Sequence, residues 1–376
     1  MTDHAATSDA VDDGPKKTPL HDLHVELGGK IVDFAGWSLP VQYPAGIMAE
    51  HRHCREQAGL FDVSHMGQVI IRGADAAGAF ERLVPGNIEG LKEGSARYTQ
   101  FTDEKGGVLD DLIASRTGDG LFVVVNAGCR DTDIAHMRAH LEPDIEVEEL
   151  HERALLALQG PAAADVLAAM APEAGGLKFM QATETSIDGL AARISRLGYT
   201  GEDGFEISVA HADAADLAKR LLADERVLPI GLGARDSLRL EAGLCLYGHE
   251  LTPDITPIEA GLAWSIGKRR REEGGFPGAQ VIQAQLADGP MKKLVGILPE
   301  GRAPAREGTE IQDLDGQCIG VVSSGGFGPT VGGPVSMGYV PPDHAEPETD
   351  VLLMVRGKAH PARIAPMPFV PHRYKR

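Results

Sequence analysis

Glycine and proline interrupt this sequence at short intervals, and that spacing limits the chain to short helices and short strands. Among its 376 residues are 46 Gly and 24 Pro, residue types that commonly mark turns. Between them, helical periodicity and strand alternation succeed one another in short stretches. The sequence therefore predicts an antiparallel α+β fold.

The length of the chain predicts more than one domain, because single hydrophobic cores stop growing at roughly 250 to 300 residues. Strand and helix patterns form one compact α/β unit over residues 62–149, inserted into a larger unit built from residues 18–61 and 150–266. The polar, basic stretch 267–275 is interpreted as a linker. The short strands predicted in residues 276–376 are typical of a small barrel or sandwich.

The periodicity also locates individual elements. Strands are predicted at residues 67–72, 97–101, 108–115, 121–126, 154–158, 191–197, 205–209, 294–298, 318–323, 337–340, 351–355 and 362–364. Helices are predicted at residues 74–83, 131–141, 160–170, 212–223 and 234–242.

The charge balance argues against one class of partner. Lys and Arg number 36 against 55 Asp and Glu, a formal net charge of -19, whereas nucleic-acid backbones bind proteins through clustered Lys and Arg. We therefore expect no nucleic-acid partner. One local basic cluster, Lys268 to Arg271, is open to two interpretations: a solvated charged face, or a docking site for an acidic partner.

Several weaker features of the sequence indicate the cellular compartment of the protein. No apolar run approaches the roughly 20 residues needed to span a bilayer, so no membrane association is expected. Residues 1–17 are polar and acidic, unlike a signal or transit peptide, and are predicted to be a disordered tail. The four cysteines lie far apart without a CxxC pair, which favours a reducing compartment over disulfides or zinc. A cytoplasmic protein without a metal site is expected.

Several common active-site motifs are absent from the sequence. Neither GxGxxG nor GxxxxGK[ST] occurs, so a dinucleotide or nucleotide phosphate site lacks its usual glycine loop. The nucleophile elbow GxSxG and the zinc motif HExxH are also missing. The sequence therefore lacks the motifs that would indicate a hydrolase or a metalloprotease.

An acidic pair, Asp110 and Asp111, lies in an otherwise apolar strand. Successive strand residues point to opposite faces, so the two carboxylates cannot share one pocket as a catalytic dyad. A carboxylate on an apolar strand is costly unless it is paired, hydrogen-bonded or functional. One is expected to reach solvent or make a structural hydrogen bond, and the other to point with Leu109 and Ile113 toward a second surface. A functional role and a capping contact both remain open.

Two further segments carry candidate binding residues. A glycine-punctuated loop at residues 198–204 leads into a strand that contains Glu206, whose carboxylate could accept paired N–H donors from a flat heterocycle. In the second segment Arg235 and Arg239 are four residues apart and share one helical face. The alternatives are a simple turn for the loop and surface ion pairs with Asp236 and Glu241 for the arginines.

Six motifs, in order along the chain, resemble the glycine cleavage T-protein family. They are residues 33–37 (DFAGW), 61–66 (FDVSHM), 106–113 (GGVLDDLI), 158–161 (LQGP), 198–204 (GYTGEDG) and 234–243 (ARDSLRLEAG). The similarity runs from about residue 18 to residue 374 and includes the ending MPFVP at residues 367–371. Each motif alone is weak, but six in sequence are specific.

The resemblance implies a cloverleaf of three domains with mainly antiparallel sheets around a central folate channel, and a last domain that is a β-barrel or jelly roll. Asp111 matches the catalytic aspartate of the family. The positions that match folate-binding or substrate-binding residues are Glu206, Arg235, Tyr374, Asn126 and Tyr199.

The activity implied by the resemblance is an aminomethyl transfer. The one-carbon unit would pass from the S-aminomethyl-dihydrolipoyl arm of H-protein to tetrahydrofolate, releasing ammonia and giving 5,10-methylenetetrahydrofolate. Tetrahydrofolate would be the co-substrate and the lipoylated H-protein the protein partner. Two alternatives stay open: a tetrahydrofolate-dependent demethylase of the dimethylsulfoniopropionate type, and a folate-binding adaptor that does not catalyse.

Overall fold

The computed structural model describes residues 14–376. Most of the predicted tail 1–17 lies outside these residues, and Lys16–Lys17 (β1) pairs in parallel with Trp37 and Ser38. Within the described part of the chain, no helix is both long enough and apolar enough to cross a membrane. The mainly antiparallel α+β class is confirmed, since among the named strands of these residues parallel pairing is recorded only for β1 with β3 and for β4 with β14.

A six-stranded sheet draws its strands from both sides of the predicted inserted unit. Its core combines the sheet residues with helices α5 (Ala163–Ala168) and α6 (His211–Leu222), through buried Leu, Val, Ile and Ala side chains. The strands are, in spatial order, β11 (Gln181–Ile187), β12 (Leu190–Arg196), β13 (Gly204–Ala210), β10 (Arg153–Gln159), β4 (Ala58–Asp62) and β14 (Val227–Pro229).

Residues 67–149 supply a separate five-stranded sheet. Leu112 and Ala114 on one face of this sheet pack with helices α3 (Ala76–Glu81) and α4 (Arg130–Leu141). Its opposite face packs against the six-stranded sheet through Phe122, Val124 and Leu155. The strands are, in spatial order, β6 (Ala96–Thr102), β7 (Val108–Arg116), β8 (Gly120–Val125), β5 (Gly67–Arg72) and β9 (Glu146–Glu149). The contact between the two sheets is where the candidate site lies.

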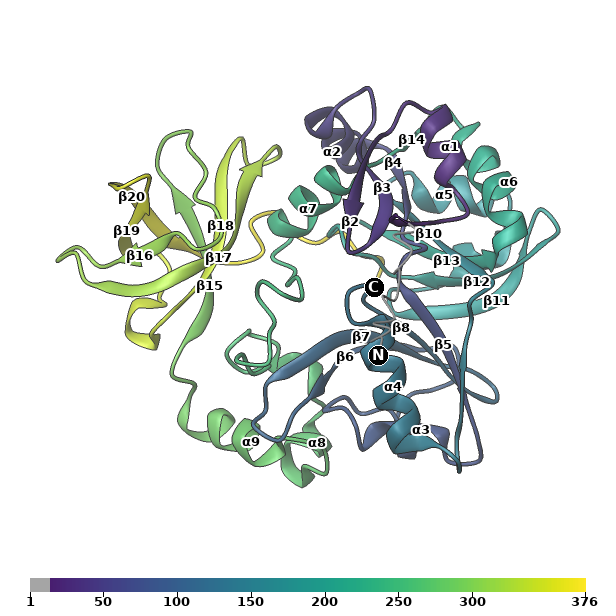
Figure 1. Ribbon diagram of the computed structural model, residues 1–376, viewed down its shortest axis with the longest axis horizontal. Coiled ribbons are helices and arrows are strands. Elements are labelled where there is room, and N and C mark those ends of the chain that lie inside the picture. The colour runs from purple at the N-terminus through teal and green to yellow at the C-terminus, as the bar shows by residue number, and fades with distance from the viewer. Residues whose placement is uncertain (1–13) are drawn as a thin grey trace, which may run out of the picture.

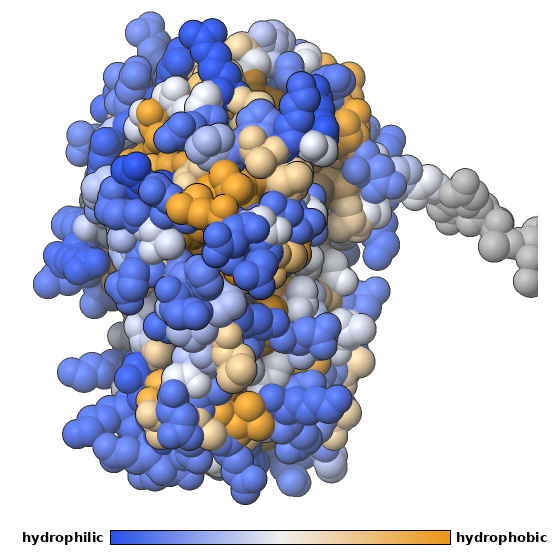
Figure 2. All heavy atoms as spheres, turned by 90° about the vertical axis from the view of Figure 1, so that its left-hand side faces the viewer, coloured by the Kyte–Doolittle hydropathy of each residue, from blue (hydrophilic) through white to orange (hydrophobic). Residues whose placement is uncertain are grey.

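The C-terminal strands form a closed barrel, which decides between the barrel and the sandwich that the sequence left open. Figure 1 shows the barrel as a lobe at the left, apart from the two sheets at the right. The face on the barrel side is mostly hydrophilic, with apolar side chains in small patches (Figure 2). The strands are, around the barrel, β15 (Lys293–Pro299), β18 (Gly333–Val340), β17 (Cys318–Gly328), β16 (Glu310–Gln312), β19 (Asp350–Val355) and β20 (Lys358–Ala365).

The remaining elements connect these parts. A third, small sheet places β3 (Trp37–Gln42) between β1 and β2 (Lys30–Phe34). Helix α7 (Leu232–Glu241) contacts β3 on one side and barrel strands β17 and β18 on another. The other helices are α1 (His21–Glu26), α2 (Ile47–Glu56), α8 (Lys268–Glu273) and α9 (Ala279–Asp288), with 3-10 turns η1 (Pro172–Gly176), η2 (Ala263–Ser265) and η3 (Pro342–His344).

The stretch 267–275, predicted to be a linker with an open basic cluster, is instead the packed helix α8. Arg270 is 5% exposed and donates hydrogen bonds to the carbonyl oxygens of Glu81 and Val84 at 2.9 and 3.2 Å. Arg269 pairs with the Glu81 carboxylate, while Lys268 keeps a 90% exposed side chain. Arg270 therefore belongs neither to a solvated charged face nor to a docking site, because its side chain is buried. The sequence could not indicate this burial, since the acceptor carbonyls lie in α3 and the turn after it, far away along the chain.

Candidate functional site

Asp110 and Asp111 lie on opposite faces of β7, as strand alternation predicts. Asp110 is fully buried on the face that packs against the helices, and makes the structural contacts expected of one member of the pair. Asp111 is partly exposed and shares its face with Ile113, which lines a cavity between the two sheets. Burial, and then the charge of Asp110, raise the pKa of Asp111 to about 7.

Asn126 holds the Asp111 carboxylate in place. The register pairs Leu112 with Val125, so the residue after β8 lies beside Asp111. The Asn126 Nδ2 donates to Asp111 Oδ1 at 2.8 Å and to the Asp111 carbonyl oxygen at 3.0 Å. It also reaches Asp110 Oδ1 at 2.9 Å. The predicted site residue Asn126 thus touches both carboxylates, although they point to different faces.

Two aromatic residues beside Asp111 were not predicted from the sequence. The hydroxyl of Tyr98 lies beside Asp111 and acts to lower the pKa of its carboxyl group. The indole of Trp264 stacks on Tyr98 with ring centroids 5.6 Å apart and remains 64% exposed. Tyr98 on β6 lies directly opposite Ile113 on β7, and directly opposite residues share a face of the sheet. Strand alternation from residue 97 could have signalled Tyr98, but Trp264 comes from a distant 3-10 turn.

Tyr199 lies between the acidic group and the arginine predicted to bind substrate. Its hydroxyl donates to the carbonyl oxygen of Cys245. The guanidinium of Arg235 lies over its ring, 4.8 Å from the centroid. Burial raises the pKa of Tyr199, and the charges of Asp111 and Arg235 both act on it. Tyr199 therefore connects the surroundings of Asp111 with those of Arg235.

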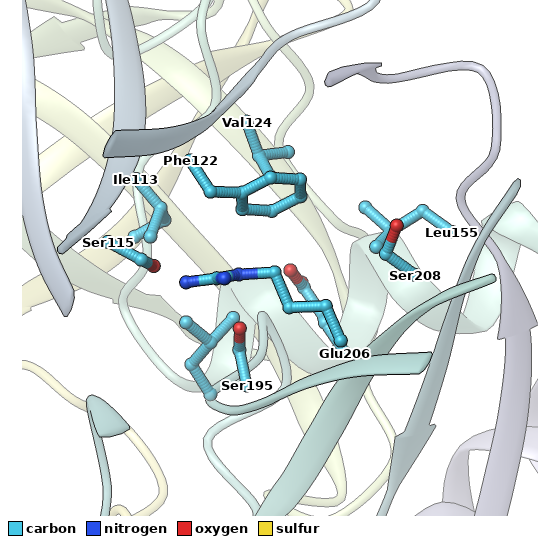
Figure 3. A pocket seen from close by; sticks show the side chains of 10 residues that line it. Ile113, Ser115, Phe122, Val124, Leu155, Ser195, Glu206 and Ser208 are labelled. Carbon is cyan, nitrogen blue, oxygen red and sulfur yellow. The ribbon is translucent and has the colours of Figure 1, made fainter. Parts of the chain in front are cut away.

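Glu206 points into the cavity between the two sheets. Figure 3 shows oxygen atoms of Ser115, Ser195 and Glu206 directed toward the centre of this space, below the Phe122 ring. Glu206 is 9% exposed, and no hydrogen bond to its carboxylate is recorded among residues 14–376. Burial raises its pKa, and the charge of Arg235 opposes that rise. A buried carboxylate without a donor is unusual and suits a ligand that brings N–H groups.

Arg235 carries the positive charge on the other side of Glu206. It lines a second, smaller cavity with Phe61, Asp62 and Ile230. Burial lowers the pKa of Arg235, and Glu206 and Tyr199 counteract this effect. His65, also near Arg235, is 5% exposed with no partner for Nδ1 among the described residues, and burial lowers its pKa to about 4.

Tyr374 is placed among different neighbours from the other predicted site residues. Its ring stacks on Phe179 with centroids 4.0 Å apart and planes at 5°. Burial raises its pKa to about 12, with Arg55 and Glu202 as the charged groups acting on it. The structure thus brings Asp111, Asn126, Tyr199, Glu206 and Arg235 together, while the recorded ring contacts of Tyr374 are with Phe179 and His372.

Arg239 is not part of a surface ion-pair network with Glu241, which corrects that alternative. It is 3% exposed and bonds the fully buried Glu250 at 2.9 Å and the barrel residue Ser324 at 2.9 Å. Asp236 does pair with it, at 2.9 Å. Glu241 instead pairs with His51 and Arg55 in the interior. These buried pairs join α7 to the barrel and hold the helix that carries Arg235.

The arrangement favours chemistry at a developing positive charge. Asp111 supplies a carboxylate oriented by Asn126, and Glu206 supplies acceptor oxygens in the same inter-sheet region. Fixed charges in a water-poor site act strongly because they need no reorganisation during reaction. The described residues contain no group of three or more His, Cys, Asp or Glu side chains placed to hold a metal ion.

Comparison with known families covers nearly all of the chain. Residues 20–270 match the model described as GCVT N-terminal domain, and residues 292–371 match the glycine cleavage T-protein C-terminal barrel domain. A mitochondrial aminomethyltransferase of Dictyostelium discoideum is 48% identical over 96% of this chain and 94% of its own length. A probable mitochondrial aminomethyltransferase of Schizosaccharomyces pombe is 44% identical over 98% of this chain and 97% of its own.

A solved structure agrees with these sequence matches. The crystal structure of glycine cleavage system aminomethyltransferase T from Bartonella henselae is 45% identical, with a TM-score of 0.90 over 96% of this chain and 99% of that chain. The names of the two eukaryotic relatives include the word mitochondrial. The expected cytoplasmic location therefore stays a prediction.

Proposed function

Because the chain belongs to the glycine cleavage T-protein family and is an aminomethyltransferase of the glycine cleavage system, we propose that the region between its two sheets holds tetrahydrofolate and that Asp111 is its catalytic residue. This proposal rests on one observation: two carboxylates, those of Asp111 and Glu206, lie in the same region between the sheets. Asp111 lies on the cavity-facing side of β7, and Glu206 points into the cavity without a donor of its own.

The pterin ring of tetrahydrofolate fits the chemistry of the Glu206 region. Its amide and amino N–H groups are a flat array of donors, and a carboxylate accepts two such donors side by side. The apolar side chains Val124 and Leu155 suit the face of an aromatic ring, while the Arg193 guanidinium lies over the Phe122 ring, 4.8 Å from its centroid. Arg235 and Tyr199 flank this region and would hold the folate beyond its pterin. Tyr374 is proposed as a contact from the C-terminal segment.

The reaction joins a folate nitrogen to the carbon of an S–CH2–NH2 group on the dihydrolipoyl arm. The C–N bond to the amino group breaks and releases ammonia. The C–S bond also breaks, the sulfur leaves as the dihydrolipoyl thiol, and the carbon bridges two folate nitrogens as 5,10-methylenetetrahydrofolate. The two N–H protons of the folate balance the ammonia and the thiol.

Asp111 would act on the charge that develops during this transfer. When ammonia leaves, the carbon becomes iminium-like and positive, and the attacking folate nitrogen becomes positive as its bond forms. A carboxylate held by Asn126 stabilises both charges and orients the nucleophile. Holding the two reactants together in the dry region between sheets supplies proximity, which is worth several kcal/mol. The chain's own residues need no covalent intermediate for these steps.

The lipoylated H-protein is the proposed partner that delivers the arm, and the proposed architecture is a cloverleaf around a folate channel. The domain bounds predicted from the sequence belong to this proposal: 18–61 with 150–266, then 62–149, then 276–376. The recorded contacts of α8 argue against the Lys268 to Arg271 cluster as the main docking surface, because Arg270 is buried.

Ammonia release is the decisive test. Purified protein is mixed with tetrahydrofolate and aminomethylated H-protein, and ammonia and methylenetetrahydrofolate are measured together. Equal amounts of both products are expected, with the signal strongly reduced in Asp111→Asn. A protein that binds tetrahydrofolate by calorimetry but releases no ammonia would be a folate sensor, and the assignment of Asp111 as catalytic would have to be withdrawn.

A further inference from the structure

A buried pair of carboxyl groups lies directly behind Asp111, on the helix side of β7. Asp110 is fully buried, Asp133 in the first turn of α4 is 4% exposed, and the two side chains are hydrogen-bonded to each other. Two buried carboxyl groups in contact cannot both be charged at low cost, because each charge loses its hydration and repels the other. One of the two therefore carries a proton that forms the hydrogen bond between them.

The surroundings of Asp110 and Asp133 indicate which of the two carboxyl groups carries the proton. Asp110 accepts two hydrogen bonds from Asn126, one from the backbone N–H at 3.1 Å and one from Nδ2 at 2.9 Å. Asp133 Oδ2 is buried and has no partner among residues 14–376. Burial, and then the contact with Asp110, raise the pKa of Asp133 to about 10. The proton therefore belongs to Asp133.

The other groups around the pair do not compensate a second negative charge. Cys129, which precedes α4, donates to the carbonyl oxygen of Leu109 at 4.0 Å and lies near Asp110, and Tyr247 lies near Cys129. Burial raises the pKa of both, so both are neutral near pH 7. Across the strand, Asp111 adds another negative charge that acts on Asp133. The N-terminal turn of α4 favours an anion, but Asp133 faces two carboxylates there.

We propose that Asp133 is a positioning residue for the aminomethyl transfer: its protonated carboxyl group holds Asp110, Asp110 holds Asn126, and Asn126 holds the Asp111 carboxylate. The amide of Asn126 is the link, because its Nδ2 reaches Asp110 at 2.9 Å and Asp111 at 2.8 Å. If Asp110 turns away, this amide loses one of its two anchors. The inference rests on the catalytic role proposed for Asp111.

Two substitutions separate a positioning role from simple packing. Asp133→Asn keeps the shape and an N–H donor for Asp110, whereas Asp133→Ala removes the donor. We expect Asp133→Asn to keep most of the turnover. We expect Asp133→Ala to lower kcat by about tenfold to a hundredfold, the scale of a misplaced catalytic group, with little change in the KM for tetrahydrofolate. Loss of Tm in Asp133→Ala without loss of kcat would show that Asp133 only supports packing.

A direct measurement on the wild-type protein covers the case in which Asp133→Ala does not fold. Protein labelled with 13C at the Asp carboxyl carbons should show one carboxyl group still protonated at about pH 8, and that signal should be missing in Asp133→Asn. If all carboxyl groups are ionised at this pH, or if Asp133→Asn loses as much turnover as Asp133→Ala, the proposal is overturned.

Asp111→Asn is measured in the same assay to keep the two proposals apart. A fully active Asp111→Asn would remove the catalytic role of Asp111, and the kinetic argument for Asp133 with it. The 13C signal of Asp133 would still report whether the buried pair shares a proton. An inactive Asp111→Asn beside a fully active, well-folded Asp133→Ala would instead reject the positioning role alone.

Discussion

The amide nitrogen of Asn126 lies 2.8 Å from a carboxylate oxygen of Asp111 and 2.9 Å from one of Asp110. One side chain thus connects two acidic residues that point to opposite faces of the same strand. The consequence is an arrangement in which the orientation of the cavity-facing carboxylate depends on a buried one. The predictions below test the parts of this arrangement and the packing that surrounds it.

Asp111→Asn should lower kcat by about 10²- to 10³-fold, because it removes a charge aimed at the reacting carbon while keeping the side-chain volume. Ammonia release in steady state measures the effect, and Tm controls for folding. The matched variant is Asp110→Asn, which changes the neighbouring carboxylate on the other face. A larger loss in Asp110→Asn than in Asp111→Asn, at equal Tm, would show that the two faces have been assigned to the wrong residues.

Turnover should depend on pH through Asp111. Its pKa is raised to about 7 by burial and by the charge of Asp110, so the active carboxylate form is lost as the pH falls below about 7. In Asp110→Asn the repelling charge is gone, and the acidic limb of kcat should move to lower pH even where the plateau is reduced. An acidic limb at the same pH in both proteins would mean that another group titrates.

The same raised pKa predicts an effect on stability. Between about pH 4 and pH 7 the folded protein keeps a proton on Asp111 that the unfolded chain has released. The free energy of unfolding therefore falls as the pH rises through this window. Asp111→Asn has no such proton to lose, so its Tm should equal or exceed that of the wild type at about pH 8. A clearly lower Tm for the variant at that pH would show that the charged Asp111 carboxylate does not destabilise the folded protein.

Glu206→Gln should weaken tetrahydrofolate binding. The substitution replaces one acceptor oxygen by an N–H donor, and the mismatch with a pterin donor costs roughly 1 to 3 kcal/mol, or about 5- to 150-fold in Kd. Calorimetry measures the change. Glu152→Gln in the turn before β10 is the control, because that side chain is 93% exposed. Equal Kd values for the wild type and Glu206→Gln would remove Glu206 from the site.

Arg270→Ser should destabilise the fold without changing recognition of the lipoylated carrier. The substitution leaves buried carbonyl acceptors without a donor and Glu81 without one of its partners, which costs about 3 kcal/mol. Denaturant unfolding measures this loss. Lys268→Ser is the matched control and should change stability by less than about 0.5 kcal/mol, because its side chain is 90% exposed. A raised KM for the carrier in Arg270→Ser at unchanged stability would restore the docking hypothesis.

Much of the fold was predictable because it depends on local patterns. Strand alternation in residues 67–72 and 108–115, and helical periodicity in residues 131–141, agree with β5, β7 and α4 to within a residue or so. The helix α8 was not predictable in the same way. Its six residues are all charged, and a charged stretch gives no apolar periodicity that would distinguish a helix from a linker.

In the candidate site, too, some residues could be predicted from local sequence patterns and others could not. Asp111, Asn126 and Glu206 could be named because they lie in distinctive motifs and because strand alternation separates Asp111 from Asp110. Asp133 could not be recognised, since an acidic residue in the first turn of a helix is ordinary on a surface. Only its burial against Asp110 gives it a role.

By itself the sequence determined the class of the fold, the separate faces of the acidic pair and the family to which the chain belongs, because periodicity and motifs are local properties of the chain. The tertiary structure alone decided the charge state and environment of individual groups. Burial and the contact with Asp110 raise the pKa of Asp133, Arg270 is buried against carbonyl oxygens on and after α3, and Arg239 pairs with Glu250. The physical reason is that desolvation and pairing depend on what lies within a few ångströms in space, which the order of residues does not state.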